Sequence, residues 1–216
     1  MIFLNKSSFI LAVTGGVACG KSEVGRILQQ HGFLVCDADG VAHDLMKKGA
    51  HVYQAVVECF GEKILAENGE ISRVALGKIV FKNSAQLEKL NALVHPLIRK
   101  VLMKKMATFR KSTQPAAVLI PLLFEAKMED LDWDTILCVS AEEDVVFDRL
   151  EKRGFNRSES AERIAAQFSL KEKESRSDVV LHNSGSLDDL ESELIDLVDQ
   201  FRKKCVGKDC YFSVED

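Results

Sequence analysis

Residues 15–22 form a pattern that can bind phosphate. They read Gly-Gly-Val-Ala-Cys-Gly-Lys-Ser and fit G-x-x-x-x-G-K-[ST]. In this pattern the glycines let backbone N–H groups turn inward around phosphate oxygens, the lysine reaches the β- and γ-phosphates, and the serine hydroxyl ligates Mg²⁺. We therefore predict a nucleotide site with Ser22 as the metal ligand, and its binding residues are Gly16, Val17, Ala18, Cys19, Gly20, Lys21, Ser22 and Glu23.

The surroundings of this pattern match a strand–loop–helix unit. The apolar run at 10–13 supplies a strand before the loop, and Val24, Ile27 and Leu28 give the helix at about 22–30 a buried face. The positive N-terminus of that helix points at the same anion. A chance match in a glycine-containing turn would lack this context. The pattern therefore predicts a P-loop NTPase fold of the α/β class.

Short apolar runs predict the strands of a buried parallel sheet, at residues 9–14, 33–37, 116–120, 136–139 and 179–181. From about residue 39 to 114 the pattern is helical, with apolar positions that step by three and four between Leu87 and Phe109. Pro96 either kinks that helix at His95 or begins a second helix. A helix–loop–helix at 142–173 and an amphipathic helix at 187–203 follow. Helices on both faces of such a sheet make three layers.

The composition limits the class of protein. The 216 residues carry a formal net charge of −4, which argues against a nucleic-acid partner. The six cysteines form no C-x-x-C pair, the start of the chain has no signal-like apolar segment, and no apolar run approaches ~18 residues. We therefore expect a cytoplasmic protein without a disulfide framework, membrane contact or obligate protein partner.

Other motifs favour a small-molecule kinase among P-loop proteins. Residues 37–40 fit the D-x-x-G of GTPases, but no N-K-x-D follows a later strand. The third strand runs into Pro-Leu-Leu-Phe-Glu at 121–125 instead of ending in Asp-Glu, as a motor ATPase would require. A kinase must position an acceptor hydroxyl, hold Mg²⁺ and neutralise the moving phosphoryl group. It needs a carboxylate near the acceptor and cations that close over the phosphates.

The carboxylates are Asp37 and Asp39, at the carboxyl end of the second strand, where ligands bind in open α/β sheets. If the strand continues, both side chains lie on one face. We assign Asp39 as the base and Asp37 as its helper. The alternative is that one of them only caps the helix that starts near Gly40.

The cations are Arg149 and Arg153, at i and i+4 on one predicted helix face. Guanidinium groups suit bidentate phosphate contacts, and we expect both arginines on a lid that closes over the nucleotide and excludes water. For Lys152 a solvated helix face is the better interpretation.

Several stretches together resemble one family, dephospho-CoA kinase, over about residues 10–190. Residues 13–22 are similar to the family's L-T-G-G-I-G-S-G-K-S, and residues 35–39 to its V-I-D-A-D. The other matching stretches are 69–73 with Leu76 and Phe81, 93–98, 121–125, 149–153, 165–167 and 177–180 with Asn183 and Gly185.

The resemblance implies transfer of the γ-phosphate of ATP to the ribose 3′-hydroxyl of dephospho-CoA, the last step of coenzyme A synthesis. Lys21 and Ser22 would then serve ATP and Mg²⁺, and Arg149 would contact phosphates. On the acceptor side it implies Asp37, Asp39, His95 and Glu125, although His95 can equally be a helix cap or a packed side chain. The parts implied are a nucleotide-binding core at 1–40, 115–150 and 177–204, a helical CoA-binding insertion at 41–114, a lid at 151–176 and a tail at 205–216.

Two other functions stay open: a P-loop kinase with a nucleoside or nucleotide acceptor, and an ATP-dependent switch protein that hydrolyses slowly. Three departures from the family pattern also matter. Ala18 and Cys19 replace Gly-Ser, and Cys19 could make the loop oxidisable. Glu23 replaces a threonine and would weaken ATP binding if it pointed inward. His182 and Ser184 replace Asp and Asn, which puts a contact to adenine in doubt.

Overall fold

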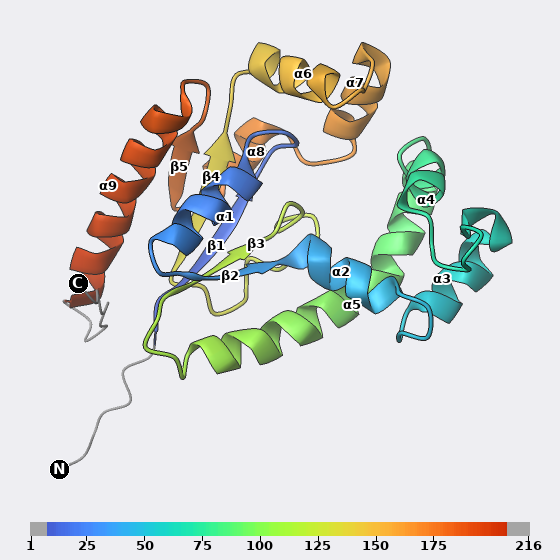
Figure 1. Cartoon of the computed structure of the whole chain (residues 1–216), viewed down its shortest axis with the longest axis horizontal. Coiled ribbons are helices and arrows are strands. Elements are labelled where there is room, and N and C mark those ends of the chain that lie inside the picture. Colours follow the sequence, from blue (N-terminus) through green and yellow to red (C-terminus); the bar gives the residue numbers. More distant parts are fainter. Residues whose placement is uncertain (1–7, 207–216) are drawn as a thin grey trace.

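Five parallel strands form the centre of the molecule, in the order β2-β3-β1-β4-β5 (Figure 1). The computed structural model describes the backbone of residues 8–206 and the side chains of residues 8–201. All five predicted strands are confirmed, with ends that shift by at most one residue. The strands are β1 Ile10–Gly15, β2 Leu34–Asp37, β3 Ala116–Leu119, β4 Thr135–Ser140 and β5 Val179–His182.

The two faces of the sheet pack against different helices. Leu11 belongs to a cluster that includes the buried sides of α1 (Lys21–Gln30) and α9 (Leu187–Val206). Its neighbour Ile10 belongs to a second cluster, formed with α5 (Ser84–Phe109) and the rest of the helical insertion. Successive residues of a strand point to opposite faces, so β1 contributes to both clusters. The predicted three-layer α/β fold is confirmed.

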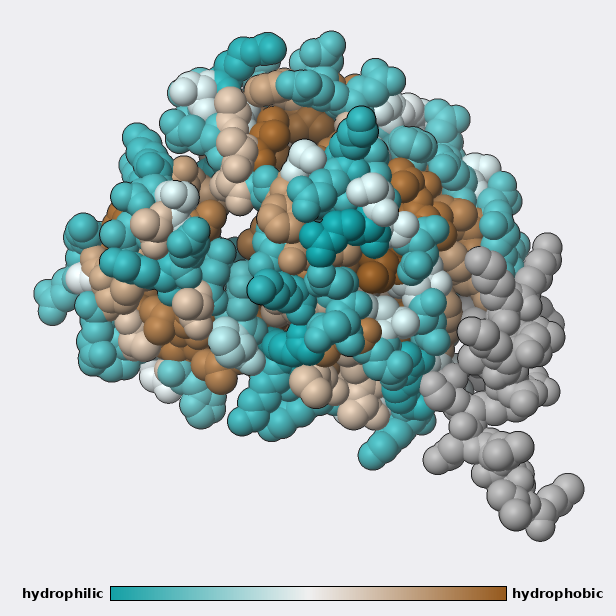
Figure 2. Space-filling view, turned by 180° about the vertical axis from the view of Figure 1, so that it is seen from behind, coloured by the Kyte–Doolittle hydropathy of each residue, from teal (hydrophilic) through white to brown (hydrophobic). Residues whose placement is uncertain are grey.

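The stretch predicted to be helical, 39–114, is helical. Within this stretch the strand-type pairing that the structure describes is one isolated bridge between Leu65 and Ile71. Pro96 lies inside α5, which excludes a separate helix that starts there. Figure 2 shows, from behind, a hollow between this insertion, on the left of the view, and the rest of the molecule. The other helical segments are α2 Ala38–Met46, α3 Tyr53–Phe60, the 3₁₀ turn η1 Glu62–Ile64 and α4 Arg73–Val80.

Between β4 and β5 the chain forms three helices, so the predicted helix–loop–helix at 142–173 is wrong in number. They are α6 Glu143–Lys152, α7 Arg157–Ala165 and α8 Leu170–Ser175. Gly154, with φ +86°, separates α6 from α7. Ser169 caps α8 by accepting from the backbone N–H of Glu172, which adds a helix start that the hydrophobic pattern did not indicate.

The ends of the chain give less information. Helix α9 confirms the predicted amphipathic helix and runs three residues further than predicted. The predicted tail, 205–216, begins inside α9, and its residues after 206 lie outside the described part. No helix in residues 8–206 is both long and apolar enough to cross a membrane.

Candidate active site

A pocket of about 360 Å³ opens at the carboxyl ends of β1, β2 and β3, the edge at which parallel α/β sheets bind ligands. The predicted site residues that line it are Val17, Ala18, Gly20, Lys21, Ser22, Glu23, Asp37, Asp39 and Arg153. Leu119, Pro121 and Gln167 complete the lining. The predicted residues that do not line it are Gly16, Cys19, His95, Glu125 and Arg149.

Two glycines let the phosphate-binding loop pass close to its neighbours. Gly15 has φ +140°, and a Cβ there would collide with the backbone carbonyl of Val139 in β4. Gly20 has φ +101°, and a Cβ there would collide with the side-chain amide of Asn183. Both backbone conformations strain any residue that carries a Cβ. The motif therefore needs these glycines for the path of the chain as well as for access to phosphate.

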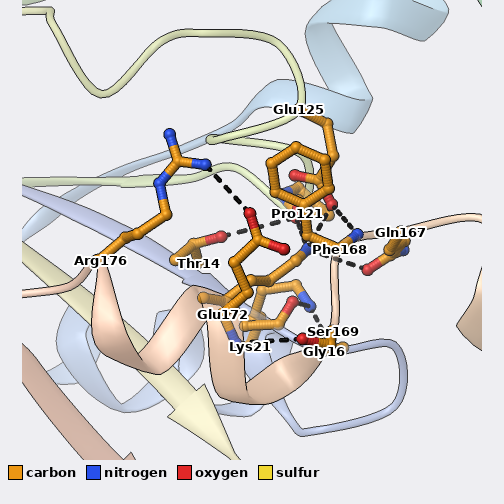
Figure 3. Close-up of polar contacts among 12 residues, drawn as sticks. Thr14, Gly16, Lys21, Pro121, Glu125, Gln167, Phe168, Ser169, Glu172 and Arg176 are labelled. Atoms are coloured by element: carbon orange, nitrogen blue, oxygen red, sulfur yellow. Dashed lines mark hydrogen bonds and ion pairs between the residues drawn. The ribbon is translucent and has the colours of Figure 1, made fainter.

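Lys21 already points into the loop. Its Nζ donates to the carbonyl oxygens of Gly15 at 2.9 Å and Gly16 at 2.6 Å, and Figure 3 shows the contact with Gly16. Desolvation is the main reason that the pKa of Lys21 falls to about 8, and the positive charge of Lys173 acts in the same direction. A bound phosphate would favour the charged form of Lys21, so the loop is arranged for an anion.

Arg149 braces the loop instead of lining the pocket. Its guanidinium donates to the carbonyl of Ala18 and to Oδ1 of Asn183, both at 3.3 Å. Nδ2 of Asn183 in turn donates to the carbonyl of Cys19 at 2.8 Å. The loop is thus held by a side chain from α6 and another that follows β5. The contact of Arg149 with phosphate stays a prediction.

Arg153 does line the pocket, from the end of the helix that carries Arg149. Helix α6 ends at Lys152, and Arg153 is its C-terminal cap residue, with φ −88° and ψ 3°. Gly154 follows with φ +86°, so Arg153 occupies the last position of the predicted i, i+4 pair and not the interior of the helix. The cap position directs the Arg153 side chain to the pocket.

Asp37 and Asp39 both line the pocket but belong to different elements. The expectation that they share a strand face is wrong, since β2 ends at Asp37 and Asp39 lies in the first turn of α2. Oδ1 of Asp37 accepts from the backbone N–H of Asp39 at 3.0 Å, so Asp37 caps the helix. Burial, and then the charge of Asp37, raise the pKa of Asp39, while Lys21 and Arg73 oppose the shift. Asp39 therefore holds its proton more strongly than an ordinary aspartate does.

Glu125 lies in a polar cluster beside the pocket. Its Oε1 pairs with Nζ of Lys173 at 2.9 Å and accepts from the backbone N–H of Phe168 at 2.9 Å (Figure 3). His95 on α5 lies close enough for the charge of Glu125 to raise its pKa, but burial dominates and lowers it. His95 is therefore neutral at pH 7. The acceptor-side roles of both residues stay predictions.

One departure from the family pattern loses its expected consequence. Cys19 is 1% exposed, and burial raises the pKa of its thiol, so it has little of the thiolate character that oxidation requires. Glu23 lines the pocket, and its carboxylate accepts two hydrogen bonds from Arg26, at 2.6 and 2.8 Å; its effect on ATP binding stays a prediction. Oγ of Ser184 accepts from the backbone N–H of Glu142 at 2.9 Å, a contact between two loops.

Sequence reasoning assigned no role to three residues that shape the site: Gln167, Asn183 and Lys173. Gln167 and Asn183 belong to stretches that resemble the family, so a signal was present. Lys173 gave none, because the run Lys-Glu-Lys-Glu at 171–174 is typical of a solvated helix. Only packing against β1 and β4 identifies the face of α8 that is buried.

Comparison with known proteins identifies the family. A family model described as dephospho-CoA kinase matches residues 9–189. A dephospho-CoA kinase of Carboxydothermus hydrogenoformans is 41% identical over 196 residues, which cover 90% of this chain and 95% of the relative. One of Bacillus licheniformis is 42% identical over 194 residues, 89% of this chain and 96% of the relative.

Solved structures agree with this result. The Thermus thermophilus protein TT1252 is 32% identical with a TM-score of 0.72, and a dephospho-CoA kinase from Campylobacter jejuni is 26% identical with a TM-score of 0.67. Each alignment covers 90% of this chain and 98% of the other. A shikimate kinase from Bacteroides thetaiotaomicron, 14% identical with a TM-score of 0.53 over 90% of this chain and 98% of its own, shares the fold. The predicted fold and kinase class are therefore confirmed, and the chain belongs to the dephospho-CoA kinase family.

Proposed function

We propose that this chain transfers the γ-phosphate of ATP to the ribose 3′-hydroxyl of dephospho-CoA, with Asp39 as the base. The observation that carries the proposal is that one pocket, in a chain of this family, contains both the phosphate-binding loop and the Asp39 carboxylate. Phosphoryl transfer asks a protein mainly to position two substrates and to stabilise charge. A carboxylate beside the phosphate site is where an acceptor hydroxyl would lose its proton.

Each residue of the pocket then has a distinct task. Lys21 and the N–H groups of the loop bind the phosphates, and Arg153 neutralises the group in transfer. Asp37 keeps Asp39 in position by capping α2. We assign His95 and Glu125 to the acceptor side, where the neutral ring of His95 offers a hydrogen bond without charge.

The pocket also fits Mg²⁺. It offers the hydroxyl of Ser22 and the carboxylates of Asp37 and Asp39, and oxygen ligands are those that Mg²⁺ prefers. Substrate phosphates and water would complete the shell, since Mg²⁺ is usually held by few protein ligands. When bound, Mg²⁺ neutralises charge on the phosphates. We assign Ser22 as its protein ligand.

We further propose that residues 41–114 bind the acceptor and that residues 151–176 act as the lid. A cation–π contact between the two regions supports this: the guanidinium of Arg163 in α7 lies 4.7 Å from the ring centroid of Phe81, and 3.9 Å from that of Phe155 within the lid. Closure of such a lid would keep water, the competing acceptor, away from the phosphate. The cysteine usage and the family support a cytoplasmic location.

The test is a product assay with the purified protein, ATP and Mg²⁺. ADP release is measured without an acceptor, with dephospho-CoA, and with a panel of nucleosides and nucleoside monophosphates. The proposal expects strong stimulation by dephospho-CoA alone, with CoA as the product. Stimulation by a nucleotide would overturn the acceptor, and turnover that is indifferent to every acceptor would indicate a switch protein instead.

A further inference from the structure

Lys173 on α8 is the one charged residue that is fully buried in the described part of the chain, with a relative exposure of 0%. A buried ammonium group is costly unless acceptors take up its three N–H donors. Its position also differs from that of its neighbours, because Lys171 and Glu172 on the same short helix are exposed. The environment of Lys173 therefore needs an explanation beyond helix formation.

Three acceptors surround the Lys173 ammonium. Nζ lies 2.7 Å from the carbonyl oxygen of Pro121, 2.9 Å from Oε1 of Glu125 and 3.1 Å from Oε1 of Gln167. The same Glu125 oxygen also accepts from the backbone N–H of Phe168. Figure 3 shows Pro121, Glu125 and Gln167 drawn together at this point. Lys173 therefore ties the turn after β3 to the link between α7 and α8.

Both of the tied segments reach the pocket, whereas Lys173 does not. Pro121 and Gln167 belong to the pocket lining, and Gln167, like Lys173, lies in the C-terminal half of the proposed lid, 151–176. The other donor to the Pro121 carbonyl, Oγ1 of Thr14, is more distant, at 3.5 Å. A shift of the ammonium group would therefore move two parts of the pocket wall at once.

We propose that Lys173 is a positioning residue for phosphoryl transfer: through its three hydrogen bonds it fixes Pro121 and Gln167, and with them the anchored end of the lid, relative to the phosphate-binding loop. It touches no substrate and takes no part in proton transfer. Its contribution is to hold Gln167, in the lid, at a fixed distance from the phosphoryl group in transfer.

Stability alone explains this cluster poorly. A buried ion pair can often be replaced by apolar side chains of similar volume without loss of stability. The Lys173–Glu125 pair is also destabilised by a desolvation penalty, because Oε2 of Glu125 is buried and has no hydrogen-bond partner among the described residues. Three directional hydrogen bonds from one atom instead hold two segments in a fixed orientation, which apolar packing cannot do as well.

The test separates folding from positioning with four variants. Lys173→Met leaves the Glu125 charge unpaired and should be destabilised. The double variant Lys173→Met with Glu125→Gln removes both charges and should regain most of the lost stability. Glu125→Gln alone is the kinetic reference for the double variant, because Glu125 is itself assigned to the acceptor side. Lys171→Met is the matched control, since it is the same substitution at an exposed position of the same helix. Denaturant unfolding gives the stability, and steady-state kinetics give kcat, KM and the ratio of ADP released to CoA formed.

We expect the double variant to fold and still to lose about tenfold or more in kcat relative to Glu125→Gln alone, because small misplacements at a reacting centre are costly. Its KM for ATP should change less than about threefold, since the phosphate-binding loop is untouched. More ADP should be released per CoA formed, because a loosened lid admits water. The proposal is overturned if the folded double variant keeps the kcat and the product ratio of Glu125→Gln, whatever its stability.

If the double variant does not fold, a further variant still tests the proposal. Gln167→Ala removes one acceptor of Lys173 without leaving a charge unpaired, and should raise ADP release per CoA by about threefold. An unchanged ratio in that variant contradicts the proposal. The inference rests on the proposed reaction, and the wild-type protein separates the two: failure of the wild type to form CoA contradicts the reaction itself.

Discussion

The two sides of the pocket are built in different ways. The phosphate side, residues 15–23, is one continuous stretch of chain, shaped by its own glycines and the start of α1 and braced from outside by Arg149 and Asn183. The composite side is assembled from separate segments, and its lining residues are Asp37, Asp39, Leu119, Pro121, Arg153 and Gln167. Contacts such as those of Lys173 with Pro121 and Gln167 hold these segments in fixed positions relative to one another.

This difference indicates how each side should respond to substitution. On the phosphate side the backbone provides most of the binding groups, so side-chain changes there should act mainly on ATP affinity. On the composite side, side chains from distant segments must meet at one place, so changes should act mainly on kcat. Four experiments test this contrast.

The largest effect is expected from Asp39→Asn. Loss of the base should lower kcat by about 10²–10⁴-fold with little change in the KM for ATP. Asp37→Asn is the comparison, since asparagine keeps the oxygen that caps α2 and should preserve stability, while loss of the helper's charge should lower kcat less than loss of the base. Steady-state kinetics with dephospho-CoA measure both variants. A greater loss of kcat in Asp37→Asn would reverse the assignment of base and helper.

The next effect separates the two arginines. Arg153→Ala should lower kcat by about 10²–10³-fold, because it removes a cation from the pocket lining. Arg149→Ala should act mainly on the KM for ATP, since Arg149 holds the carbonyl of Ala18 in the loop. Lys152→Ala, exposed and adjacent, should match the wild type. If both arginine variants lose only ATP affinity, the contrast between the two sides fails.

A smaller effect concerns the pH dependence of ATP binding. With the pKa of Lys21 at about 8, the free protein carries the Lys21 charge at pH 7 and has mostly lost it at pH 9. Because phosphate favours the charged form, ATP should bind about tenfold more weakly at pH 9 than at pH 7. Titration calorimetry measures this change. The same profile in Lys21→Arg, whose charge does not titrate in this range, would contradict the assignment.

The smallest effect concerns the contact between lid and insertion. Arg163→Ala removes an arginine that lies over Phe81 and Phe155, and should raise the KM for dephospho-CoA by about twofold to fivefold, with ~0.5–1 kcal/mol lost in stability. Arg157→Ala is the control, because Arg157 lies over Phe147, which belongs to neighbouring α6 and not to the insertion. It should lose similar stability but keep its KM. Equal KM values in both variants would show that the contact does not transmit acceptor binding.

The hydrophobic pattern of the sequence predicted the strands and most helices well, but it predicted poorly where they end. The five strands could be predicted because a strand that is buried on both faces consists almost entirely of apolar residues, which are easily recognised in the sequence. The position of Asp39 could not be predicted, because the apolar pattern does not show whether the chain continues β2 after Asp37 or starts α2. The hydrogen bond from the Asp39 N–H to the Asp37 side chain starts the helix at this point. The position of Arg153 could not be predicted either: it is the C-terminal cap of α6 and not an interior residue, because Gly154 ends the helix.

The phosphate side of the site, the order of strands and helices, and the family were determined by the sequence itself, because each depends on residues close together in the chain or on motifs read in order. Tertiary structure alone decided that Arg149 braces the loop while Arg153 lines the pocket, and that Glu125 pairs with Lys173. It also decided that one lysine of a charged helix is buried while its neighbour is exposed. The physical reason is that burial and pairing depend on which surfaces meet after folding, and residues 30 or more positions apart carry no local record of their contact.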